Sequence, residues 1–291
     1  MKLFRKTFLI LFFILIFSLT GFTGQKVQLP ISIFVTIMPQ VYLVERIGGD
    51  RVIVDALVLP GKNSATYSPS FKQMLGLARA KIFFRIGVPM ENSLMPKIKN
   101  VGKQILIVDT RKGIKLRRME RGHHHGGGGG LDPHIWLDPK LVKKQAKTIC
   151  EALIQVDPEG FLEYTSGLNS FIDDLDILDK KIKAAFASVN GSSFFVFHPA
   201  FGYFADAYGL KQVAVEIEGK APKGKDLSIF VKKAIKENAR VIFVQPQFDK
   251  TTANKIAKAI NGTVVSIDPL AKNYLENMEI MAGLVADTFS N

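Results

Sequence analysis

The feature that most constrains the fold of this chain is a long apolar pattern of helical period over residues 157–189. Apolar side chains recur at every third or fourth position from Phe161 to Phe186, and no proline interrupts the pattern after Pro158. A continuous helix of about 30 residues would be ~45 Å long, since each residue adds about 1.5 Å. The pattern therefore predicts one long, stiff helix that spans a molecule of two lobes.

Short β-rich runs alternate with helical patterns on both sides of this segment. Such alternation predicts parallel sheets with helices on their faces. We therefore predict an α/β fold of two lobes, each a parallel β-sheet flanked by helices, joined by one long rigid helix. The expected strands are 31–36, 52–59, 81–86, 104–108, 194–197, 212–217, 240–244 and 263–267, and the other expected helices are 39–47, 70–79, 140–153, 201–208, 227–238, 251–260 and 274–289.

The N-terminal residues 1–24 are typical of a signal peptide for export. Three cations precede an unbroken apolar run at 8–17, and small residues follow it. This run is shorter than the ~20 residues that a membrane-spanning helix needs, and no cysteine follows it to carry a lipid. We expect an exported protein, periplasmic or on the extracellular face of the cytoplasmic membrane, and leave open whether the signal is cleaved. The expected domains are a first lobe at 27–156, the long helix at 157–189 and a second lobe at 190–291.

The chain is basic, with a net charge of +13, or about +10 once the three signal cations are subtracted. The basic residues are scattered along the expected helices instead of alternating with aromatic residues in one patch, so nucleic acid is not an expected partner. Attraction to an anionic membrane surface fits this charge better. The positive net charge of the chain also repels a cation at long range. Any cation site must therefore be formed by side chains close to the ion.

Cys150 is the only cysteine of the chain, which excludes an intramolecular disulfide. It lies in the expected helix 140–153 beside Ile149 and Leu153. We therefore expect it to act as a small buried apolar residue instead of a reactive thiol.

The five histidines of the chain lie in three segments that are unusual for other reasons. His134 precedes a helix, within the sequence Asp-Pro-His-Ile-Trp-Leu-Asp-Pro. His198 and Asp268 each follow a strand of the second lobe, which is where ligands bind in open α/β sheets. Two imidazoles and a carboxylate suit a borderline-soft cation such as Zn²⁺, provided that a cleft between the lobes brings them together. The remaining histidines, His123, His124 and His125, precede five glycines in an expected mobile loop at 121–130.

Several motifs in these places resemble one known family. The segments 132–139, 197–210 and 265–270 look like the zinc and manganese group of solute-binding proteins of bacterial ABC importers. The resemblance covers nearly the whole chain after the signal. It also includes the segments 86–91, 216–220 and 242–248.

The resemblance implies a metal site between two lobes, with His134, His198 and Asp268 as ligands. A histidine at position 198 resembles the zinc branch more than the manganese branch, so Zn²⁺ is expected ahead of Mn²⁺. The family's histidine-rich loop corresponds to His123, His124 and His125 as possible auxiliary ligands. The implied protein is a monomer that hands zinc to the membrane permease of an ABC importer.

One position departs from the family's pattern. The family supplies a further histidine before a Tyr-x-Pro stretch of the first lobe, and Ala65 occupies that position here. An alanine side chain cannot bind a metal. Three outcomes stay open: a water completes the coordination, a loop histidine replaces the missing ligand, or high-affinity metal binding has been lost.

Two other classes of function compete with zinc capture. A zinc hydrolase would also have three protein ligands and an open position, but it needs a general base, and no His-Glu-x-x-His motif is present. Glu216 and Glu218 are the only candidates for a base by motif position. A protein of the same fold that binds another ligand, or acts as an adhesin or surface chaperone, would not need both His134 and His198.

Overall fold

A computed structural model describes residues 29–101, 105–119, 130–216 and 224–290 of the chain. The expected signal peptide and the histidines 123–125 lie outside the described residues. Residues 31–291 form one compact unit. Within the described ranges, no helix combines the length and the apolar character required to cross a bilayer.

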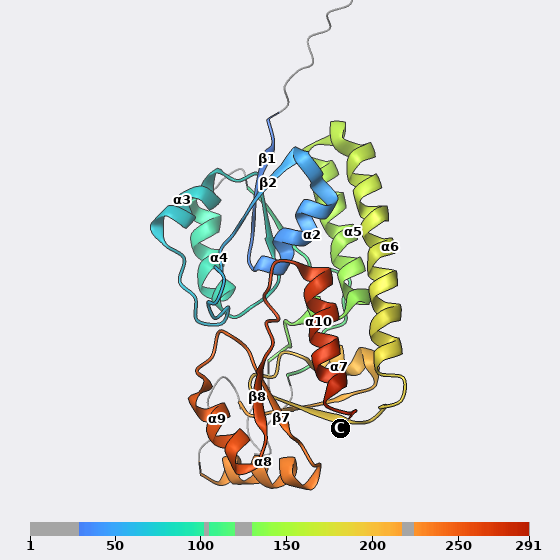
Figure 1. The fold of residues 1–291 in the computed structure, drawn as a ribbon. Coiled ribbons are helices and arrows are strands. Elements are labelled where there is room, and N and C mark those ends of the chain that lie inside the picture. The colour runs from blue at the N-terminus through green and yellow to red at the C-terminus, as the bar shows by residue number, and fades with distance from the viewer. Residues whose placement is uncertain (1–28, 102–104, 120–129, 217–223, 291) are drawn as a thin grey trace, which may run out of the picture. The chain divides into compact units, whose positions relative to one another are not determined.

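Two parallel sheets form the framework of this unit (Figure 1). Each has the strand order in which the first strand of the sheet lies between the second and the third, so successive crossovers go to opposite sides of that strand. The predicted α/β class with two parallel sheets is thereby confirmed, and strand ends differ from the expected ones by a few residues. The first sheet has the order β2 (Val52–Ala56), β1 (Ile31–Val35), β3 (Ile82–Arg85), β4 (Leu106–Asp109), and the second β6 (Lys211–Ala214), β5 (Ser193–Val196), β7 (Val241–Val244), β8 (Thr263–Ser266).

The expected helices are all present, and one further helix appears that the pattern did not predict. This helix, α4 (Met90–Val101), contains Pro96, a residue that disfavours the interior of a helix. Its residues Met90, Leu94 and Ile98 are buried, so packing compensates for the proline. The other helices are α2 (Met38–Gly48), α3 (Phe71–Arg79), α5 (Pro139–Val156), α6 (Phe161–Ala185), α7 (Gly202–Tyr208), α8 (Lys225–Lys236), α9 (Lys250–Ala259) and α10 (Tyr274–Asp287).

The long helix α6 stands in the chain between the two sheets, and it is shorter than expected. It has 25 residues, about 37 Å at 1.5 Å each, because residues Pro158–Gly160 form a 3-10 turn before it and the helix ends at Ala185. Its buried face packs on α2, α5 and α10 (Figure 1). Gly167 permits close approach to α2, since a Cβ there would lie 2.6 Å from the carbonyl oxygen of Ile47.

The principal apolar core includes residues of both sheets and of α6. In β5, Phe194 and Val196 belong to this core, whereas the alternate residue Phe195 belongs to a second core with α8 and α9. Separating the two sheets would therefore expose apolar surface of the principal core, at a cost of about 1.5–3 kcal/mol for each large side chain.

Cys150 lies in α5 and is buried, as predicted. Burial raises the pKa of its thiol, which keeps it protonated and unreactive.

Candidate metal site

His134 is held by a carboxylate two residues earlier in the chain. Asp132 is buried, and its Oδ1 accepts a hydrogen bond from the backbone N–H of His134 at 3.0 Å and lies 2.7 Å from the ring Nδ1. The ring also lies 5.1 Å from that of Trp136, whose Nε1 donates to the carbonyl of Pro269 at 2.8 Å. With Nδ1 occupied, Nε2 is the nitrogen of His134 that is available to a metal.

His198 is held in the same way by a carboxylate from a neighbouring strand. It follows β5, and its Nδ1 lies 2.6 Å from Oε2 of Glu216, which follows β6. The ring stacks on Phe248 at 4.8 Å, and the side-chain amide of Gln245 binds both backbone groups of His198. Burial lowers the pKa of His198 below its usual 6.5, against the opposing effect of Glu216, so the imidazole tends to be neutral and able to bind metal.

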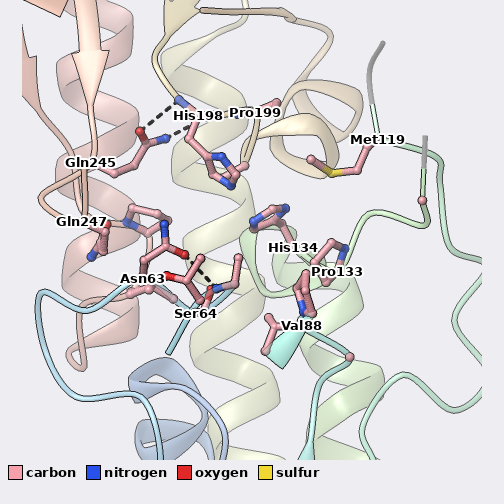
Figure 2. A pocket seen from close by; sticks show the side chains of 18 of the residues that line it. Asn63, Ser64, Val88, Met119, Pro133, His134, His198, Pro199, Gln245 and Gln247 are labelled. Carbon is pink, nitrogen blue, oxygen red and sulfur yellow. Dashed lines mark hydrogen bonds between the residues drawn. The ribbon is translucent and has the colours of Figure 1, made fainter. Parts of the chain in front are cut away.

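The fold brings these two histidines together. Their ring centroids lie 5.3 Å apart, and Figure 2 shows the two rings next to one another at one cavity. His134 is almost fully buried, whereas a fifth of the His198 side chain is exposed. The cavity has a volume of about 830 Å³ and also includes residues of the first-sheet loops on its wall.

Asp268 lies at the same edge of the second sheet but is engaged by other residues. It follows β8, and its Oδ1 accepts hydrogen bonds from Nε2 of Gln247 at 2.8 Å and from the backbone N–H of Leu270 at 2.9 Å. Pro269 and Leu270, the next two residues, line the cavity. Among the residues that the structure describes, no group of three or more His, Cys, Asp or Glu side chains is arranged to hold a metal. The assignment of Asp268 as a ligand therefore stays a prediction.

Ala65 lies on the rim of the cavity in the loop 63–66. It is exposed, and its N–H donates to Oδ1 of Asn63 at 2.8 Å. Asn63 and Ser64 also line the cavity and appear below the histidine pair in Figure 2. This rim offers amide and hydroxyl oxygens where an imidazole would be required for a third nitrogen ligand.

Three residues that fix the histidines were not identified as site residues from the sequence, namely Asp132, Glu216 and Gln245. The local sequence could have indicated the role of Asp132, because an aspartate side chain often accepts a hydrogen bond from the backbone N–H two residues later, in an Asx turn. Glu216 was considered only as a catalytic base, and the structure places it on Nδ1 of His198 instead. Glu218 and the loop histidines lie outside the described residues.

Comparison with known proteins identifies the family of this chain. A family model described as zinc-uptake complex component A, periplasmic, matches residues 33–287. The high-affinity zinc uptake system protein ZnuA of Bacillus subtilis is 28% identical over 240 residues, which are 79% of this chain and 74% of that protein.

Solved structures of zinc-uptake proteins are also similar to this chain. A crystal structure of ZnuA is similar with a TM-score of 0.84 and 33% identity, covering 89% of this chain and 99% of that one. The laminin-binding protein of Streptococcus agalactiae, a bifunctional adhesin and metal transporter, has a TM-score of 0.78 over the same shares of the two chains. Its identity to this chain is 23%, and this likeness shows a shared fold alone.

Proposed function

Because this chain belongs to the family of periplasmic components of zinc-uptake complexes, we propose that it captures zinc in the cavity lined by His134 and His198. It then delivers the ion to an ABC importer. The observation that carries the proposal is the pair of imidazoles at 5.3 Å, each bound through Nδ1 to a carboxylate.

The carboxylates of Asp132 and Glu216 prepare the histidines for metal. A metal-binding histidine usually donates its other ring N–H to a carboxylate, which fixes the tautomer and makes the free nitrogen more basic. Both histidines have this arrangement. In our proposal the zinc ion binds Nε2 of His134 and Nε2 of His198.

We propose Asp268 as the third ligand, with the fourth position left open by Ala65. Because Gln247 and Leu270 engage Oδ1, Oδ2 is the oxygen of Asp268 that would bind the ion. A water fills the fourth position most simply, because the rim at 63–66 has no imidazole. Nitrogen ligands favour Zn²⁺ over Mn²⁺ at such a site.

The partners follow from the family. A component of a zinc-uptake complex acts with the permease and the ATPase of an importer. We further propose that the signal at 1–24 directs export, that the protein acts as a monomer on the outer face of the cytoplasmic membrane, and that its lobes are 27–156 and 190–291, joined by 157–189.

The family is one of solute-binding proteins, so the chain is not an enzyme. Consistent with this, Glu216 is bound to His198 and is not placed as a base beside an open metal position. An adhesin role would use the same fold without depending on both histidines, and no contact in the cavity favours it.

Calorimetric titration of the metal-stripped protein with zinc tests the proposal, beside a variant that lacks residues 121–130. Saturable one-to-one binding in both proteins is expected if a water fills the position left open at Ala65. Binding only with the loop present would assign a loop histidine as the replacement ligand. The absence of saturable binding in both would reject zinc capture.

A further inference from the structure

The cavity is much larger than a zinc ion requires. Zinc binds its ligands at about 2.0–2.3 Å, so an ion between two imidazoles fills a small part of a space of about 830 Å³. That volume lies within the range of pockets that bind small organic molecules, roughly 300–1,000 Å³. The wall beyond the histidines carries amides and hydroxyls, from Asn63, Ser64, Thr66, Asn92 and Gln247.

A guanidinium also lies on this wall. Arg111 donates from Nε and Nη2 to the two carboxylate oxygens of Asp109, at 2.9 and 2.7 Å. Its third nitrogen, Nη1, has no hydrogen-bond partner within the described part of the chain. The guanidinium carries five N–H donors, so the pair with Asp109 leaves some of them unused, and Arg111 is one of the residues that line the cavity.

The backbone is shaped to accept this guanidinium. Gly87 has φ +87°, and a Cβ at that position would lie 2.0 Å from Nη1 of Arg111. The buried carboxylate of Glu91 holds the same turn, because its oxygens accept hydrogen bonds from the N–H groups of Ile86 and Gly87 at 2.8 and 2.9 Å. Arg111 is therefore held from two sides, by Asp109 and by the turn at Gly87.

A site for an unaccompanied cation does not need such a group. A guanidinium stays positively charged in proteins, and unused N–H donors beside a Zn²⁺ ion offer nothing to a cation. The chain as a whole is also positive, at +13, which disfavours a bare cation and favours a neutral or anionic species. The partner that suits unused guanidinium donors is a carboxylate.

We propose that the cavity receives zinc together with a small carboxylate chelator. His134 and His198 bind the ion, oxygen atoms of the chelator complete its coordination in the space that an imidazole at position 65 would fill, and a carboxylate of the chelator accepts hydrogen bonds from Arg111. This inference rests on the proposed function and specifies its substrate as a zinc complex.

Equilibrium dialysis with radiolabelled citrate tests this, using the metal-stripped protein with and without an equimolar amount of zinc chloride. We expect citrate to be retained only when zinc is present. Arg111→Gln removes the guanidinium. Asp109 still has a cationic neighbour in this variant, because Nε of Arg85 lies 3.7 Å from its Oδ2. We expect this variant to bind the zinc–citrate complex roughly tenfold or more weakly, with its affinity for zinc chloride alone unchanged. The control for net charge is Lys112→Gln, because Lys112 is exposed and does not line the cavity. This variant should bind zinc and citrate as the unmodified protein does.

The outcomes separate this inference from the function on which it rests. Zinc binding without citrate retention would overturn the chelator site and leave zinc capture intact. Citrate retention without zinc, or equal retention by Arg111→Gln and Lys112→Gln, would also overturn it. Failure to bind zinc in any form would reject the proposed function itself.

Discussion

The two walls of the cavity differ in how firmly the protein prepares them for a metal. On the histidine wall, His134 and His198 each contact a carboxylate and an aromatic ring, and the backbone N–H of each donates to a side-chain oxygen. On the rim at 63–66, Ala65 is exposed and carries no ligand atom. We therefore expect the affinity for zinc to depend mainly on the histidine wall. The rim determines what else enters the cavity.

Removing a histidine should have the largest effect. We expect His134→Ala and His198→Ala each to weaken zinc binding by a factor on the order of 100 or more, because a ligand counts for more than the groups that orient it. Calorimetric titration of each variant measures this. Ser64→Ala, on the rim, is the matched control and should change the affinity little. Unchanged binding in either histidine variant would refute the assignment of that residue.

Removing the carboxylates behind the histidines should have a smaller effect. We expect Glu216→Gln and Asp132→Asn to weaken zinc binding about 10- to 100-fold, since each variant keeps the shape but lowers the basicity of its histidine. The same titration applies. If Glu216→Gln were as damaging as His198→Ala, Glu216 would be a metal ligand itself, and our distinction between ligands and orienting groups would be wrong.

Introducing an imidazole on the rim should give that wall a metal ligand, as the histidine wall already has. We expect Ala65→His to strengthen binding of zinc alone by about tenfold, because a third nitrogen ligand replaces an open position. The same variant should bind zinc–citrate less well, since the new side chain fills the proposed chelator space. Ala65→Gln offers a side chain of similar length without an imidazole and should not strengthen zinc binding. Equal affinities of the two variants for zinc would mean that the rim does not reach the ion.

Acidification should have the smallest effect on the metal-free protein, and its sign follows from His198. Its pKa in the folded protein is lowered by burial, so near pH 6 the unfolded chain binds more protons than the folded one. The stability contributed by the neutral ring is complete above about pH 6.5 and is lost as the pH falls through the lowered folded pKa.

Urea unfolding at about pH 7.5 and pH 5.5 measures this change in the free energy of unfolding. The drop on acidification should be smaller in His198→Asn, which has no titrating ring. Zinc affinity should fall over the same interval because protons compete for imidazole. An equal drop in both proteins would place the acid-sensitive group elsewhere, and a zinc affinity independent of pH would contradict the histidine ligands.

Much of the fold was predictable because local patterns report local structure. The alternation of β-rich and helical runs indicated both parallel sheets, and the apolar period between Phe161 and Phe186 indicated α6. The helix α4 was missed because Pro96 argues against a helix interior, although Met90, Leu94 and Ile98 recur at the spacing of a buried helix face.

Local patterns predicted the candidate site only in its positions along the chain, and the resemblance to a family added that His134, His198 and Asp268 share one metal site. Residues nearby in the chain were enough to predict that His198 and Asp268 follow strands and that His134 precedes a helix. Tertiary structure alone decided that the two imidazoles lie 5.3 Å apart, that Glu216 binds His198, and that Asp268 is engaged by Gln247. It also decided that Arg111 lies against Gly87 on the same cavity. The physical reason is that periodicity and turn preferences act over a few residues, whereas these contacts depend on how strands and loops from distant parts of the chain pack around a shared core.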